Sequence, residues 1–373
     1  MGSVSSRPKA PAFPQRRGGE GRRPLASSPK NLYNNSMDLV AALMEPAAYP
    51  EPTSRVELIQ THISLVFLTD RFAYKVKKPV DLGFLNFTTL RRRHHYLEEE
   101  LILNRRLCPE IYLEVLPIVA HRQGLRLGGP GHPREYALKM VRMPQERMMD
   151  EVADRGELQV EALYRIIARL APFYEQAAAG PRINKFGEPG IITYNHEENF
   201  SRTETLVGKM LTRELFEEVR EFSRSFLRGK RDLFLRRIRE GRIRDCHGDL
   251  HMRNICLADG IYIFDCIEFN PRFRYGDVAA DIDFLAMDLD FHGLRAMSRH
   301  FVEGFAKAAG DPELLVMLDF YKCYRAYVRG KINAFAAQDP DLTPPAREQA
   351  RKAAQAYFTL AGAYAREGAR WAA

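Results

Sequence analysis

The chain has 373 residues, of which 45% are hydrophobic and 28% charged, the composition of an ordinary globular protein. Its formal net charge of +8 is uneven, because residues 1–35 hold seven Lys or Arg and one Glu. The rest of the chain is close to neutral, so the charge does not predict a nucleic-acid-binding protein. No run of about 18 apolar residues predicts a membrane-spanning helix. Five cysteines without a CxxC pair argue against a disulfide framework or a thiolate zinc site and favour a cytoplasmic protein.

The first half of the chain predicts an extension followed by a sheet-rich lobe. Residues 1–36 are rich in Pro, Gly, Ser and Arg and contain little to bury, so we predict a disordered basic extension. Beyond them, apolar and β-branched residues run or alternate over strand-length windows. Residues 37–144 are therefore expected to form a small N-terminal lobe with a single major helix. Its predicted elements are strands over 60–70, 71–78, 110–121 and 134–144 and a helix over 85–107, with Thr88 or Thr89 near the helix start.

The second half predicts a mostly helical lobe over residues 145–373. Apolar residues at helical spacing recur along it, interrupted by a loop and two short strands around the turn at Asp259 and Gly260. The fold class expected is therefore α+β with two lobes. No GxxxxGK[ST] sequence is present, so a P-loop nucleotide site is not expected. The predicted helices cover 157–179 and 212–238, with two long ones from 311 to the C-terminus, and the loop with its strands covers 243–269.

The segment HGDLHMRN, at 247–254, carries residues suited to phosphoryl transfer. This reaction needs a carboxylate to orient the attacking hydroxyl and accept its proton, and oxygen ligands to hold magnesium on the phosphates. Asp249 stands five residues before Asn254, the interval between Asp and Asn in the kinase HRDxxxxN loop. Eleven residues further on, Asp265 ends the apolar strand IYIF, which would aim its carboxylate at a cleft.

The segments HGDLHMRNI, IFDCIEF and FRYGDVAADIDFLAMDL resemble the aminoglycoside-phosphotransferase-like branch of the protein-kinase-like fold, over roughly residues 37–340. The resemblance implies an ATP-dependent kinase that moves the γ-phosphate to a hydroxyl of a small molecule. It implies that Asp249 is the catalytic base, Asn254 a Mg²⁺ ligand, and Asp265 the aspartate that bridges Mg²⁺ to the phosphates. Flanking segments are similar to a bacterial subfamily often fused to a C-terminal P-loop ATPase domain, which we do not expect here.

A phosphate-binding lysine is expected in FAYKVKK. Lys75 matches the lysine of the kinase VAIK strand, and Lys77, on the same face of the strand, is the alternative. A helix glutamate holds this lysine in kinases. Glu100 lies about 60° from Leu97 at roughly 100° per residue and so flanks the apolar stripe of its helix, whereas Glu99 points away. We therefore predict that Lys75 and Glu100 pair and bind ATP in the N-terminal lobe.

The sequence leaves other functions open. It has no GxGxxG loop and no APE segment, which favours a small-molecule kinase over a regulated protein kinase. The alternatives are a nucleotide-binding pseudokinase that serves as an interaction module, and a metal-dependent hydrolase that uses His247, Asp249 and His251. We expect His247 to brace the loop instead.

The acceptor and the oligomeric state are not predicted. The acceptor could be aminoglycoside-like or another metabolite. Asp281 is expected to be structural, as is Asp277, to which the resemblance assigns a supporting role under the catalytic loop. Four carboxylates of the helical lobe could meet an amine-bearing acceptor: Glu268, Asp283, Asp288 and Asp290.

Overall fold

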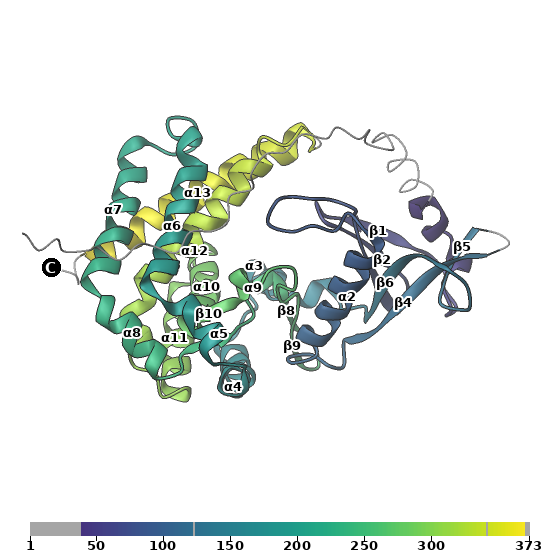
Figure 1. Ribbon diagram of the computed structural model, residues 1–373, viewed down its shortest axis with the longest axis horizontal. Helices are drawn as coiled ribbons and strands as arrows, with labels where there is room; N and C mark the ends of the chain where they lie inside the picture. Colours follow the sequence, from purple (N-terminus) through teal and green to yellow (C-terminus); the bar gives the residue numbers. More distant parts are fainter. Residues whose placement is uncertain (1–38, 122–123, 341, 370–373) are drawn as a thin grey trace, which may run out of the picture.

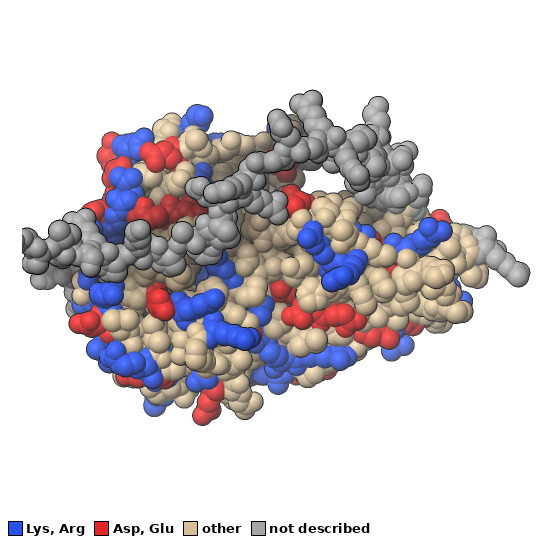
Figure 2. Space-filling model, in the orientation of Figure 1, with Lys and Arg blue, Asp and Glu red and all other residues tan. Residues whose placement is uncertain are grey.

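The computed structural model describes residues 39–121, 124–340 and 342–369. Figure 1 shows a sheet-rich lobe beside a larger helical lobe. The predicted basic extension over residues 1–36 lies outside the described residues. None of the helices in the described ranges has the length and apolar character that a membrane span requires. All five cysteines are free and buried. Basic and acidic side chains are interspersed on the face of the molecule that Figure 2 shows.

The N-terminal lobe is a six-stranded antiparallel sheet covered on one face by helix α2. Its strand order is β1-β2-β3-β6-β4-β5, so the central β3 pairs with β2 and β6. Thr89 caps α2 by accepting a hydrogen bond from the Arg92 amide, which places the helix start later than the predicted residue 85. Strands β1 and β5 were not predicted. The elements are β1 (Glu57–Gln60), β2 (Ser64–Leu68), β3 (Phe72–Lys77), α2 (Leu90–Asn104), β4 (Tyr112–His121), β5 (Gly124–Leu127) and β6 (Pro133–Val141).

Strand β3 divides its side chains between the two faces of the sheet. Tyr74 and Val76 are buried in the core on the face away from α2. Because successive side chains of a strand alternate, Lys75 and Lys77 both face α2, where they reach Glu100. The alternation that predicted strand β3 therefore also brings two lysines to the helix.

The C-terminal lobe is mostly helical. The predicted helix over 212–238 is two helices, because Lys230 between them has a non-helical ψ of 20°. The longer elements are α4 (Val160–Gln176), α6 (Pro189–Thr203), α7 (Arg213–Gly229), α8 (Arg231–Arg239), α10 (Val278–Phe291), α11 (Arg295–Ala308), α12 (Leu314–Ala336) and α13 (Pro344–Ala369). The shorter ones are η2 (Gln145–Arg147), α3 (Met149–Asp154), α5 (Pro181–Asn184), η3 (Lys185–Gly187), η4 (Glu204–Leu206), β7 (Ile243–Asp245), η5 (Met252–Asn254), β8 (Ile255–Leu257), β9 (Ile261–Ile263), α9 (Pro271–Arg274) and β10 (Tyr275–Asp277). A 3-10 turn, η1 (Pro46–Ala48), precedes the sheet.

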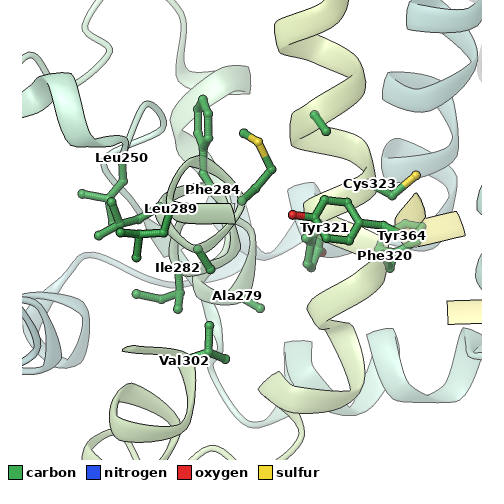
Figure 3. Packing of buried hydrophobic residues seen from close by; sticks show 14 of the residues in the cluster. Leu250, Ala279, Ile282, Phe284, Leu289, Val302, Phe320, Tyr321, Cys323 and Tyr364 are labelled. Atoms are coloured by element: carbon green, nitrogen blue, oxygen red, sulfur yellow. The ribbon is translucent and has the colours of Figure 1, made fainter. Parts of the chain in front are cut away.

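Helix α10 is the centre of the helical lobe and is buried along nearly its whole length. Figure 3 shows Ala279, Ile282 and Leu289 of this helix among Leu250 of the preceding loop and Val302 of α11. The buried side chains of α10 are mostly apolar but include Asp281, Asp283 and Asp288, and helices α11 and α12 pack against it. The loop before α10 is thereby packed against the buried core of the lobe.

A fully buried arginine ties three segments of this lobe together. Arg237 of α8 donates to both Asp277 oxygens at 2.6 and 2.7 Å and to both Asp311 oxygens at 2.8 and 2.9 Å. Asp277 also caps α10 by accepting from the Ala279 amide at 2.9 Å. The predicted structural role of Asp277 is thus a cap and an ion pair.

We expect Arg237→Met to lower the free energy of unfolding by about 3–5 kcal/mol, because it leaves two buried carboxylates without their cation. Arg236→Met is the matched control, since the Arg236 side chain is 45% exposed and pairs with Glu313 at the surface. The control should lose about 1 kcal/mol or less. Denaturant unfolding of both variants tests this, and equal losses would contradict it.

Candidate active site

A cavity of about 900 Å³ lies between the two lobes. The sheet lines it with Val66, Ala73 and Lys75, and the helical lobe lines it with Asp249 and Asp265. Apolar side chains thus meet a cation and two carboxylates in one cleft. The cavity has the size and mixed lining of a small-molecule site.

Lys75 joins two residues that are far from it in the sequence. Its ammonium group donates to Glu100 Oε1 at 2.6 Å and to Asp265 Oδ1 at 2.7 Å. Burial by itself would lower the pKa of Lys75, but the charges of Asp265 and Glu100 outweigh it and raise the pKa well above the usual value. The predicted Lys75, Glu100 and Asp265 therefore form one charged group at the cavity, with the lysine protonated.

Lys77 forms a second, deeper pair with the same glutamate. Its fully buried ammonium group donates to Glu100 Oε2 at 2.7 Å and to Glu268 Oε1 at 2.5 Å. Burial would raise the pKa of Glu100, but Lys75 and Lys77 together lower it. Lys75 lines the cavity and Lys77 does not, so Lys75 is the lysine placed to meet a ligand.

The loop after β7 brings Asp249 and Asn254 together. Asn254 Nδ2 donates to the Asp249 carbonyl at 2.9 Å and to Asp249 Oδ2 at 3.2 Å, which leaves Asn254 Oδ1 available as a ligand. Burial would raise the pKa of Asp249, but His251, 3.3 Å away, together with Arg329 and His247 holds it well below the usual value. Asp249 is therefore ionised and can accept a hydrogen bond from a hydroxyl group.

Asp281 holds this loop from beneath. It accepts from the His247 amide at 2.7 Å and from the Gly248 amide at 3.0 Å. Gly248 has φ 88°, and a Cβ there would lie 2.7 Å from the Phe273 carbonyl oxygen, so only glycine fits. The support under the loop, which the resemblance assigned to Asp277, is thus provided by Asp281.

Asp265 has an unusual backbone. Its φ of 62° is the one positive value of a non-glycine residue among the described residues. Aspartate tolerates this conformation better than most residues, and the Asp265 amide donates to Tyr112 Oη at 3.1 Å. The turn directs the carboxylate toward Lys75, two residues after β9 ends. The sequence predicted the place of Asp265 but not this backbone conformation.

The oxygen donors at this site suit magnesium better than a transition metal. Mg²⁺ is bound by one or two carboxylates together with substrate phosphates and water, and Asp265 and Asn254 offer such oxygens. His247 instead braces the loop, as predicted, because Nε2 lies 2.9 Å from the Phe264 carbonyl oxygen and Nδ1 accepts from the Asp249 amide. Within the described ranges, no cluster of three or more His, Cys, Asp or Glu is arranged to hold a metal.

The four carboxylates considered for an amine-bearing acceptor are occupied or lie elsewhere. Glu268 lines the cavity but pairs with Lys77. Asp288 accepts from the Met252 amide at 2.9 Å, and Asp290 pairs with Lys322 at 2.9 Å. Asp283 is buried, which raises its pKa well above the usual value, and it does not line the cavity. Glu268, Asp288 and Asp290 are thus held by partners distant in sequence, whereas Asp283 is buried without a hydrogen-bond partner among the described residues.

Comparison with known proteins finds relatives that are longer than this chain. No family model matches the chain. Uncharacterized proteins of Mycobacterium tuberculosis (strain ATCC 25618 / H37Rv) and Mycobacterium bovis (strain ATCC BAA-935 / AF2122/97) are each 33% identical over 280 residues. These residues are 74% of this chain and 54% of each relative. The chain therefore spans about half the length of the curated relatives it matches.

A solved structure shares the arrangement of the two lobes. A choline/ethanolamine kinase family protein from Mesorhizobium loti matches 89% of this chain and 100% of its own, with a TM-score of 0.52 and 14% identity. A spectinomycin phosphotransferase solved with ADP and spectinomycin matches 90% of this chain and 98% of its own, with a TM-score of 0.45 and 12% identity. With its curled sheet, single covering helix and helical second lobe, the chain has the bilobal, protein-kinase-like fold of the choline/ethanolamine kinase family protein.

Proposed function

We propose that this chain is an ATP-dependent phosphotransferase that moves the γ-phosphate of ATP to a hydroxyl group of a small molecule. The observation that carries the proposal is the contact of Lys75 with both Glu100 and Asp265. It lies in the cavity that Asp249 also lines. A cation for the phosphates, a carboxylate for the metal and a carboxylate for the hydroxyl thus occur together, as phosphoryl transfer requires.

The residues have separate tasks in this proposal. Lys75 binds the α and β phosphates and is held in place by Glu100. Asp249 accepts the hydrogen bond of the acceptor hydroxyl, orients its oxygen toward the γ-phosphorus and takes its proton. The bond from the γ-phosphorus to the oxygen it shares with the β-phosphate breaks, a bond to the acceptor oxygen forms, and ADP leaves. The electron pair of the broken bond stays on ADP.

Asn254 and Asp265 are the residues that would hold Mg²⁺. Mg²⁺, if bound there, would neutralise negative charge on the phosphates. Asp265 pairs with Lys75 at 2.7 Å, so both groups face the place where the phosphates of ATP would lie. Two hydrogen bonds from Asn254 Nδ2 to Asp249 orient the Asn254 side chain. They hold the proposed base, Asp249, and the proposed metal ligand, Asn254, at a fixed distance from each other.

The experiment that tests this function measures nucleotide binding and transfer separately. Purified protein should melt at a higher temperature with ATP and Mg²⁺ than with ATP and a chelator, because binding to the native state stabilises it. Labelled ATP should then pass phosphate to at least one compound in a panel of aminoglycosides, amino sugars, sugar acids and other metabolites. Binding without transfer would favour a pseudokinase, and no binding would contradict both functions.

We expect Lys75→Met and Glu100→Gln each to lower kcat/KM for ATP by about 10- to 100-fold, the loss of one charged hydrogen bond. The double variant should lose less than the product of the two, because both residues act on one group. Lys78→Met is the control, since Lys78 follows on the same strand end but donates to the Thr61 carbonyl at 2.7 Å. If the losses of kcat/KM simply multiply in the double variant, Glu100 positions Lys77 and not Lys75. Steady-state kinetics of the three variants measures this.

A further inference from the structure

The part of the cavity beyond Asp249 is formed by helices α6, α9 and α12. Side chains from these three helices line it together with the catalytic loop, on the opposite side from the sheet. Asp249 lines the same cavity, so an acceptor whose hydroxyl reaches Asp249 would contact these helices. The charged residues of these helices that line the cavity are Glu198 and Arg202 of α6, Arg272 and Arg274 of α9, and Arg325, Arg329 and Lys331 of α12, and Arg274 is paired with Asp245.

One carboxylate serves two of these cations. Glu198 accepts from Arg202 at 3.0 Å through Oε1 and from Arg272 through Oε2. Arg272 also donates to the neutral Asn195 at 2.8 Å. One positive charge of this trio therefore has no counterion within it.

Lys331 adds a second uncompensated charge. Its ammonium group donates to Asn199 Oδ1, and no carboxylate of the described residues lies within ion-pair distance of it. Burial lowers the pKa of Lys331 to about 8, with Arg202 and Arg272 lowering it further and Glu198 raising it. The group is still mainly protonated at neutral pH, so it brings a positive charge to the cavity.

Arg329 adds a third cation, which forms no ion pair among the described residues although the charges of Asp249 and Asp288 act on it. Its Nε is buried without a hydrogen-bond partner among the described residues, and its guanidinium lies 5.6 Å from the centre of the Tyr357 ring. Arg325, one turn earlier on α12, differs, because it binds Asp281 at 3.2 Å and the carbonyls of Gly248 and Ala280. Arg325 is thus committed to the loop, and Arg329 keeps an unused donor.

A neutral histidine lies among these charges. His196 stacks between Phe320 and Tyr324, with ring centres 4.9 and 4.4 Å away, and burial lowers its pKa to about 3. Its Nε2 has no hydrogen-bond partner among the described residues.

The acceptor end therefore holds four cations, Arg202, Arg272, Arg329 and Lys331, against Glu198. The four cations exceed Glu198 by three charges, by two when Asp249 is counted, and by one when the buried Asp288, whose charge also acts on Arg329, is counted as well.

We propose that the acceptor of this enzyme is an acid, a hydroxyl compound that also carries a carboxylate or phosphate group. Lys331, Arg329 and Arg272 bind the acidic group while the hydroxyl reaches Asp249. The inference rests on the proposed function, since it names the acceptor class of the same site. An amine-bearing acceptor would place a further cation among unpaired ones, which is unfavourable in such a cleft.

Four sugars with the same ring test the charge of the acceptor. Glucose is neutral, glucosamine carries an amine, glucuronate a carboxylate and glucose 6-phosphate a phosphate. Each is titrated into protein saturated with ADP and Mg²⁺, and affinity is read from the melting temperature. Transfer from ATP is followed in parallel. We expect glucuronate or glucose 6-phosphate to bind and to be phosphorylated in preference to glucose and glucosamine. Whichever of the two binds more tightly shows whether the site prefers a carboxylate or a phosphate.

Variants test the residues that bind the acid. Lys331→Met and Arg329→Met should each weaken binding of the preferred acid by about 10- to 100-fold, and Lys331→Arg should restore most of it. Lys352→Met is the matched control, because its side chain is 73% exposed on α13, outside the cavity. It should bind the acid like the parent protein. The melting temperature of each variant without ligand reports whether it is folded.

Three results would overturn the inference. They are preferential binding of glucosamine, binding of neither acid, or equal affinity for the acid in the parent protein and in folded Lys331→Met and Arg329→Met. Stabilisation by ADP and Mg²⁺ is recorded in the same samples. If it persists, only the acceptor class is wrong and the kinase proposal stands. If it is lost in the parent protein, the proposed function fails as well.

Discussion

Asp249→Asn is expected to transfer phosphate about 10²- to 10⁴-fold more slowly than the parent protein, the usual contribution of a positioned base. Asparagine keeps the size of the side chain and can still accept from Asn254 Nδ2, which lies 3.2 Å from Asp249 Oδ2. It removes the negative charge that accepts the proton of the hydroxyl. Binding of ATP with Mg²⁺ should change little, because neither Lys75 nor Asp265 contacts this carboxylate in the structure.

The comparison requires a measured turnover, and slow hydrolysis of ATP without an acceptor is sufficient. Melting temperatures with ATP and Mg²⁺ serve as the control for folding and binding. Suppose that the parent protein binds nucleotide but has no Mg²⁺-dependent turnover above the Asp249→Asn background with any acceptor. The chain would then be a pseudokinase, and the proposed chemistry would be wrong.

Asp265→Asn should lose the stabilisation that Mg²⁺ adds to ATP binding while keeping the fold. The substitution removes the charge that pairs with Lys75 and would hold the metal. Asparagine is chosen over alanine because residue 265 has φ 62°, a conformation that asparagine accepts and most other residues do not.

Calorimetric titration with ATP, with and without Mg²⁺, measures the effect directly. Asp259→Asn is the matched control, because Asp259 is an exposed turn residue of the same strand pair and bonds to Tyr262 at the surface. The control should bind like the parent. Wild-type affinity and turnover in Asp265→Asn would remove this residue from the metal site.

Local sequence was sufficient to find much of the site. Asp249 and Asn254 are five residues apart on one loop, so the sequence alone shows their spacing. Glu100 followed from its angle on a helix and Lys75 from its position in a strand. These are properties of single elements, and the structure brings Lys75, Glu100 and Asp265 into contact. Their roles in catalysis remain predictions.

Contacts between distant elements could not be predicted in this way. Glu268 is 191 residues from Lys77, and nothing near either residue indicates that they pair. The same holds for Arg237 with Asp311, which are 74 residues apart. Lys331 and Arg272 reach one end of the cavity only because α12 and α9 pack there. The charge of the acceptor end is therefore a property of the tertiary structure.

The two lysines of β3 differ in whether they would change ion-pair partners when a nucleotide binds. Lys75 has to exchange Asp265 for a phosphate oxygen when nucleotide enters, whereas Lys77 keeps Glu100 and Glu268 throughout. Lys77 and Glu268 belong to different lobes, so their 2.5 Å contact joins the lobes at a point that the reaction does not disturb. The Cys266 amide also donates to Asn104 Oδ1 at 2.9 Å, so the lobes are expected to stay joined on this side while Lys75 exchanges its partner.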